Sequence, residues 1–154
     1  MELWIQTAHA DVLKLLEQID GLVINDSEAK MLADTENLVL AGHRIRKLGP
    51  KFVVIKKGEH GAMFFGEHEA YVLPAFPTEK VVDPTGAGDS FAGAMMGYLA
   101  EQDNFEPETL KTAMAYGILV ASFNVEDFGL IHMQSITRHD VEARMKAYRK
   151  MLSF

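Results

Sequence analysis

Residues 83–91 read Asp83-Pro84-Thr85-Gly86-Ala87-Gly88-Asp89-Ser90-Phe91, a turn-forming cluster that opens directly into a helical pattern. Apolar side chains follow at Phe91, Met95 and Leu99, the spacing of one helix face. The first N–H groups of a helix lack intrahelical partners and lie at the positive end of the helix dipole. Gly86 and Gly88 allow the backbone there to approach a ligand without a Cβ. The stretch therefore predicts an anion site.

Asp89 places a carboxylate beside this anion site. Like charges repel, so a site that only holds phosphate has no use for the carboxylate. A carboxylate fits if it accepts a proton from an attacking hydroxyl, and the pair therefore favours phosphoryl transfer. The structural alternative is that two glycines shape a tight turn and that Asp89 caps the helix.

Two commoner glycine motifs are excluded by spacing. A dinucleotide-binding G-x-G-x-x-G beginning at Gly86 would need glycine at position 91, where Phe91 stands. The P-loop pattern G-x-x-x-x-G-K-[ST] occurs nowhere in the sequence. The anion site is thus neither that of a Rossmann dehydrogenase nor that of a P-loop enzyme.

Short apolar runs alternate with helical patterns along the rest of the chain. We expect buried strands at 22–24 and 52–55, shorter antiparallel strands at 62–65 and 70–73, and helices over 5–19, 38–48, from 107 and over 137–151. Between residues 113 and 121 the helical pattern is apolar nearly all round, which is typical of a buried helix. The sequence predicts an α/β layered fold with a largely parallel sheet, in a single domain.

Composition excludes several classes of site. The 154 residues contain no cysteine, which removes thiolate metal sites and disulfides and suits a reducing cytoplasm. The net charge of −7 argues against nucleic-acid binding. The N-terminus lacks the pattern of a signal peptide, and the longest near-apolar run, 113–123, is too short to span a bilayer. We expect a cytoplasmic protein without a nucleic-acid or membrane partner.

The stretch 83–91 closely resembles the C-terminal signature of the PfkB (ribokinase-like) carbohydrate kinase family. Upstream, Asn25-Asp26-Ser27-Glu28 matches the N-x-x-E motif of that family, and residues 54–61 match its strand-to-glycine nucleotide segment, in the same order. The resemblance runs from about residue 3 to about residue 129. It implies a ribokinase-like three-layer αβα sandwich, of which residues 1–154 form the C-terminal nucleotide-binding and catalytic half.

The resemblance also implies roles for the signature residues. Asp89 would be the catalytic base that deprotonates an acceptor hydroxyl. The backbone amides of Gly86, Ala87 and Gly88 would form the anion hole for the transferred phosphoryl group of ATP.

Metal roles follow from the same resemblance. Asn25 and Glu28 would organise Mg²⁺ through its waters, although an N-cap residue with an acid three positions later is also the pattern of a capping box. Asp83 and Thr85, with carbonyl groups of residues 124–129, would be ligands of a monovalent cation such as K⁺.

Four residues of the nucleotide segment complete the candidate site. Gly58 and Gly61 would bend the chain beside the nucleotide, and Lys56 or Lys57 would reach its phosphates. Because side chains alternate along a strand, the sequence does not decide between the two lysines. Two solvated lysines at a hairpin are the structural alternative.

Everything that matches belongs to the C-terminal half of the family, and we expect the N-terminal half and the lid to be absent. The first functional hypothesis is an ATP-dependent sugar or nucleoside kinase portion that is weakly active or inactive alone. The alternative is a non-catalytic nucleotide-binding or scaffold protein derived from such a kinase. A strand left at a sheet edge also predicts a homo-oligomer or pairing with a complementary N-terminal half.

Overall fold

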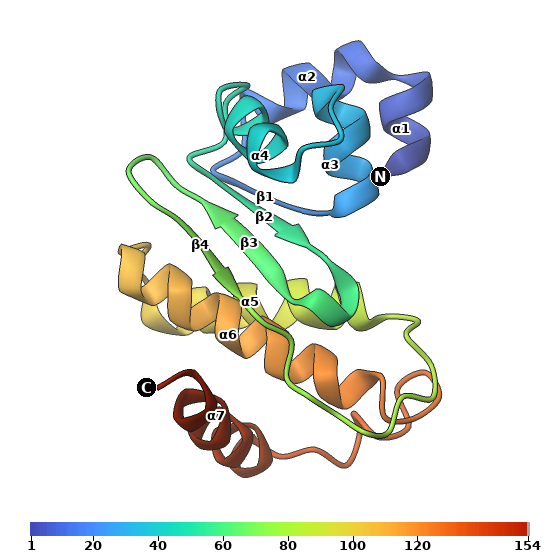
Figure 1. Ribbon diagram of the computed structural model, residues 1–154, viewed down its shortest axis with the longest axis vertical. Helices are drawn as coiled ribbons and strands as arrows, with labels where there is room; N and C mark the ends of the chain where they lie inside the picture. The colour runs from blue at the N-terminus through green and yellow to red at the C-terminus, as the bar shows by residue number, and fades with distance from the viewer. Residues whose placement is uncertain (154) are drawn as a thin grey trace. The chain divides into compact units, whose positions relative to one another are not determined.

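The computed structural model describes residues 1–153, and the chain divides into two compact units, Met1–Pro74 and Ala75–Phe154. The first unit contains both helices and strands. The regular elements of the second unit are all helices (Figure 1). The expectation of a single partial domain over residues 1–154 stays a prediction.

The first unit contains a four-stranded sheet with the strand order β1-β2-β3-β4 (Figure 1). Its strands are β1 (Gly21–Asn25), β2 (Phe52–Lys56), β3 (Ala62–Phe65) and β4 (Ala70–Leu73). β1 and β2 run parallel, whereas β2–β3 and β3–β4 are antiparallel pairs. All four strands were expected from the sequence, and the antiparallel pairing of the two shorter ones is confirmed.

The sheet is mixed, so the largely parallel sheet expected from the sequence is found only in the β1–β2 pair. The reason is the length of the connections. Residues 26–51 between β1 and β2 include two helices, which is long enough for a parallel crossover. Residues 57–61 and 66–69 are too few for a crossover, and they return the chain as hairpins.

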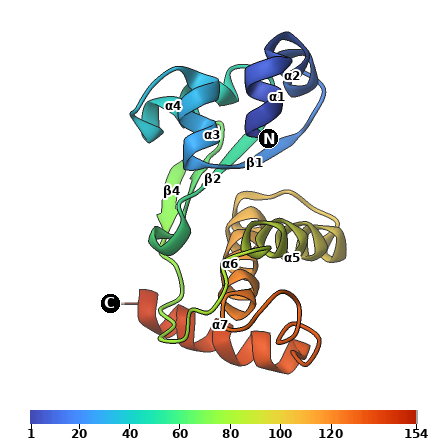
Figure 2. The same ribbon diagram turned by 90° about the vertical axis from the view of Figure 1, so that its right-hand side faces the viewer.

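Four helices cover one face of this sheet: α1 (Glu2–Thr7), α2 (His9–Leu16), α3 (Asp26–Ala33) and α4 (Leu38–Arg46) (Figures 1 and 2). The core between helices and sheet includes Leu16, Ile24, Ile45, Ile55 and Phe65, all nearly inaccessible to solvent. Each fully buried aliphatic or aromatic side chain contributes roughly 1.5–3 kcal/mol. This core holds the carboxyl ends of β1 and β2 in place.

The single helix expected over 5–19 is wrong, because α1 and α2 are separated at Ala8. Ala8 adopts φ −138° and ψ 39°, which ends α1 while its N–H still donates to the Trp4 carbonyl. Of the apolar stripe predicted there, Ile5 and Val12 enter one core, whereas Leu15 is exposed and the neighbouring Leu16 is buried in its place.

The second unit contains the helices α5 (Ala87–Gln102), α6 (Pro107–Asn124) and α7 (Arg138–Leu152) (Figure 2). α5 and α6 pack along each other, and α7 packs on α6. Phe91, Met95 and Leu99 are buried on α5, which confirms the helix expected after the signature stretch. Burial of α6 on most sides agrees with its apolar sequence.

The close approach of α5 and α6 depends on Gly117. A Cβ at this position would lie 2.9 Å from the Phe91 carbonyl oxygen and 3.1 Å from the Phe91 ring. No side chain fits there without separating the two helices. Gly117 therefore fixes how α6 lies against the helix that follows the signature stretch.

Candidate active site

The signature stretch forms a loop that leads into α5. Gly86 is the N-cap residue of α5 and has φ +83°, a left-handed conformation that favours glycine. No side chain caps this helix end. The Ala87 N–H donates to the Pro84 carbonyl at 3.1 Å, whereas the N–H groups of Gly86, Gly88 and Asp89 have no partner within residues 1–153. These donors are free to bind an anion.

Asp89 lies in the first turn of α5, beside these free N–H groups, and its side chain is exposed. The alternative that Asp89 caps the helix is not supported, because α5 has no side-chain cap. An unengaged carboxylate in this position can accept a proton from a bound hydroxyl.

Asp83 shapes the loop before Gly86. Its Oδ1 accepts the Thr85 N–H at 2.9 Å, a turn closed by a side chain. The Thr85 hydroxyl and N–H, together with the Gly129 N–H, hold the pKa of the Asp83 carboxyl below its usual range. The Asp83 side chain thus closes the turn that precedes Gly86.

Asn124, at the end of α6, forms hydrogen bonds with the signature loop. Its Nδ2 donates to the Thr85 carbonyl at 2.8 Å, and its Oδ1 accepts the Ser90 hydroxyl at 2.8 Å. The side chain is 1% exposed. Sequence analysis missed this role and considered only backbone carbonyls of residues 124–129. A polar residue within the apolar pattern of α6 was the signal that could have revealed it.

In the first unit, three of the expected site residues meet at the carboxyl ends of the parallel strands. Asn25 and Lys56 are register partners at the ends of β1 and β2, and Glu28 lies in the first turn of α3. The end of adjacent parallel strands is where α/β sheets bind ligands. Residues 25, 28 and 56 are therefore neighbours, as the resemblance implies.

Asn25 and Glu28 form a capping box. The Asn25 Oδ1 accepts the Glu28 N–H at 2.8 Å, and the Glu28 carboxylate accepts the Asn25 N–H at 3.0 Å. The structural alternative is thus realised, and it leaves room for a second role because a carboxylate has about four lone-pair sites. The other Glu28 oxygen lies 2.9 Å from the Met1 ammonium.

Electrostatics keeps Glu28 charged. Burial of the carboxyl raises its pKa, but the Asn25 N–H, the Met1 ammonium and the nearby Lys56 together lower the pKa below its usual range. A charged carboxylate beside an amide oxygen is the oxygen donor set that suits Mg²⁺ held through water. Within residues 1–153 no group of three acidic, histidine or cysteine side chains could hold a metal ion directly.

The nucleotide segment turns sharply after β2. Gly58 and Gly61 have φ +56° and φ +83°, and the Lys57 N–H donates to the Gly61 carbonyl at 2.7 Å. The φ and ψ of Gly61, +83° and −138°, exclude residues with a Cβ, whereas the left-handed conformation of Gly58 favours glycine without requiring it. Of the two lysines, Lys56 is the one whose charge acts on Glu28, a distinction that the sequence left open.

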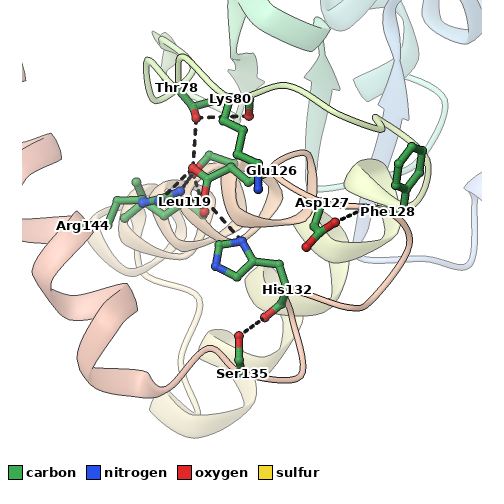
Figure 3. A network of polar contacts seen from close by, with 10 residues as sticks. Thr78, Lys80, Leu119, Glu126, Asp127, Phe128, His132, Ser135 and Arg144 are labelled. Carbon is green, nitrogen blue, oxygen red and sulfur yellow. Dashed lines mark hydrogen bonds and ion pairs between the residues drawn. The ribbon is translucent and has the colours of Figure 1, made fainter.

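A partly buried polar network lies in the second unit, and sequence analysis missed it (Figure 3). Glu126 accepts from Arg144 on α7 and from the Thr78 hydroxyl at 3.0 Å, and the His132 Nδ1 lies 3.4 Å from its other oxygen. The Arg144 guanidinium also lies 3.3 Å from the centre of the Phe123 ring. The network ties α7 to the end of α6, where Asn124 lies.

Among the helices of the described chain, none combines the length and apolar character needed to cross a membrane.

The fold is that of the ribokinase-like kinases. The structure of an aminoimidazole riboside kinase from Salmonella enterica, complexed with aminoimidazole riboside and an ATP analog, matches with a TM-score of 0.80 over 92% of this chain at 20% identity. A candidate ribokinase II from E. coli, in complex with ATP and Mg²⁺, matches with a TM-score of 0.76 over 94% of this chain at 26% identity. These likenesses confirm the expected fold class.

Residues 2–137 match the pfkB family of carbohydrate kinases, and the chain belongs to this family. The curated nucleoside kinase of Methanothermobacter thermautotrophicus is 42% identical over 88 residues, 56% of this chain. The match spans 26% of that kinase, and the two solved chains are covered to 47% and 45% of their length. The chain thus spans less than half the length of these relatives, which are kinases by name.

Proposed function

We propose that this chain carries the nucleotide-binding and catalytic half of an ATP-dependent kinase that phosphorylates a hydroxyl group of a sugar or nucleoside. The observation that carries the proposal is the loop 83–89, where free N–H groups and an exposed carboxylate stand together at one helix end. The nucleoside kinase relative and the riboside-bound structure support an acceptor that contains a ribose-like ring.

In the proposed reaction Asp89 accepts the proton of the acceptor hydroxyl as its oxygen attacks the terminal phosphorus of ATP. The free N–H groups of Gly86 and Gly88 donate to the phosphoryl oxygens, on which negative charge accumulates in the transition state. Ala87 contributes through its conformation, since its N–H is engaged with Pro84. Preorganised donors of this kind are typically worth ~3–4 kcal/mol each.

Asn25 and Glu28 would hold the waters of Mg²⁺, and Lys56 would add positive charge beside them. Mg²⁺, when bound, neutralises part of the phosphate charge. The lowered pKa of Glu28 supports this role, because the carboxylate remains charged across the neutral range. Gly58 and Gly61 would allow the chain to turn beside the nucleotide, with Lys57 at the start of that turn.

An edge of the sheet suggests where another chain would bind. β1 is an edge strand in the order β1-β2-β3-β4, so its second edge has no neighbouring strand in the described chain. Exposed strand edges pair readily with another chain. We propose that a complementary N-terminal half of a relative, or a second copy, occupies this edge, and that the chain alone is weakly active or inactive.

The first experiment is a calorimetric titration of Mg·ATP into the purified chain. Gly88→Val should abolish binding because its side chain would obstruct the free N–H groups, whereas Asp89→Asn should retain binding. Gly93→Ala is the matched control, since Gly93 lies on the same helix and a Cβ there meets nothing within 4 Å.

Phosphoryl transfer is then measured with a panel of sugars and nucleosides, alone and with an N-terminal half from a relative. Transfer that requires Asp89 supports the kinase. Binding without transfer under every combination would favour the non-catalytic nucleotide-binding alternative, and absence of binding by a folded chain would refute both.

A further inference from the structure

Asn124 is a buried side chain whose two polar ends are both engaged with the signature loop. Its amide donates to the Thr85 carbonyl, one residue before the N-cap Gly86, and accepts from Ser90, one turn into α5. The bonded residues are 39 and 34 positions away in sequence. A buried amide with both polar atoms hydrogen-bonded restrains the residues that it binds. Moving them would leave the Asn124 amide without partners in a site with little access to water, which is unfavourable.

The hydrogen bonds of Asn124 restrain the backbone on either side of Gly86. The Ser90 N–H donates to the Gly86 carbonyl at 2.8 Å, so the peptide units on both sides of Gly86 are fixed. A Cβ at position 86 would lie 3.4 Å from the Asn124 Oδ1. Asn124 therefore packs against the turn that carries the free N–H groups.

The same contacts compete with a cation. The resemblance assigns a monovalent cation to Asp83 and Thr85, but oxygen ligands must direct lone pairs at such an ion. Here the Thr85 carbonyl accepts an N–H from Asn124, and the Asp83 Oδ1 accepts the Thr85 N–H at 2.9 Å, so oxygens that would face the ion are already engaged within the loop. The residues present fit a hydrogen-bonded loop better than a cation site.

We propose that Asn124 is a positioning residue that fixes the loop 83–89 for the terminal phosphate of ATP, in place of a bound monovalent cation. The proposal rests on the proposed function for the link to ATP, whereas the fastening of the loop is independent of it. Nucleotide binding by this chain then has the same affinity in K⁺ as in a bulky organic cation.

The first test needs no nucleotide. Hydrogen exchange of the hydrogen-bonded amides of Thr85, Ala87 and Ser90 is measured by NMR in the full chain and in Asn124→Ala, Asn124→Asp and Ser90→Ala. We expect Asn124→Ala and Asn124→Asp to accelerate exchange about tenfold. Ser90→Ala should have a smaller effect, because Asn124 still donates its hydrogen bond to the Thr85 carbonyl in that variant.

The matched control is Ser122→Ala, which removes another buried polar group on α6. The Ser122 hydroxyl bonds to the Leu119 carbonyl and to Arg144, away from the loop. Its loss lowers overall stability without selective acceleration of exchange at Thr85, Ala87 and Ser90. Equal acceleration in Ser122→Ala and Asn124→Ala would overturn the proposal.

The second test compares calorimetric affinities for a non-hydrolysable ATP analog and for ADP, in KCl and in choline chloride. Asn124→Ala should weaken the analog about tenfold and ADP much less, because only the terminal phosphate meets the loop. An affinity of the unmodified chain that depends on K⁺ would overturn the proposal. If the unmodified chain binds neither nucleotide, the proposed function fails, and hydrogen exchange alone decides whether Asn124 fastens the loop.

Discussion

The Arg144 guanidinium lies 2.9 Å from the Glu126 carboxylate, and the two side chains are only 15% and 12% exposed (Figure 3). This pair joins α7 to the residues that follow α6. Removing one partner leaves a charge with little access to water, which costs about 3–5 kcal/mol for a buried pair. We expect Arg144→Met to lower the free energy of unfolding by that order, as measured in urea.

The control for this prediction is Arg138→Met on the same helix. Arg138 binds Glu101 through two hydrogen bonds of 2.8 and 2.9 Å, but both side chains are exposed. Exposed pairs contribute little to stability. A double variant, Arg144→Met with Glu126→Met, should regain most of the loss. Equal effects of the two single arginine variants would contradict a buried role for Arg144.

Gly117→Ala should destabilise the second unit by roughly 1–3 kcal/mol, because the added methyl group meets the Phe91 backbone at 2.9 Å. Gly93→Ala provides the opposite case on α5, where the same change meets nothing within 4 Å. It should raise stability by about 0.5–1 kcal/mol through better helix propensity. Thermal unfolding of both variants measures the contrast, and a stabilising Gly117→Ala would refute the close approach.

The Tyr116 phenol should lose its proton at a higher pH than a free tyrosine. Burial of the phenol and its hydrogen bond with Glu142 raise its pKa from 10.0 to about 12. A raised pKa favours the neutral phenol in the folded chain, so the stability that it contributes is complete below pH 10 and is lost as pH rises towards 12. Phenolate absorbance should show this late step in the folded chain, shifted to lower pH by Glu142→Gln and removed by Tyr116→Phe.

Glu28 should make the first unit sensitive to acid. Its pKa is held below the ordinary 4.5, so its contribution to stability is complete above pH 4.5 and is lost as pH falls through the lower folded value. In Glu28→Gln the free energy of unfolding should decline less on acidification. Glu36→Gln serves as control because Glu36 is 90% exposed. Identical acid profiles for all three proteins would contradict the role of Glu28.

The sequence by itself determined the kinds of elements and most of their positions. The continuous apolar run at 52–55 predicts a buried strand, and the spacing of Phe91, Met95 and Leu99 predicts a helix, because both signals depend on near neighbours in the chain. The capping box of Asn25 and Glu28 is equally local, since it joins residues three positions apart.

The tertiary structure alone decided which distant residues meet. Thr85 binds Asn124 across 39 positions, and Arg144 binds Glu126 across 18, and no periodicity or turn motif connects such pairs. The parallel register that sets Lys56 beside Asn25 depends on how α3 and α4 return the chain. These contacts arise from packing of whole elements, which is why a local pattern located the signature loop but not the side chain that fastens it.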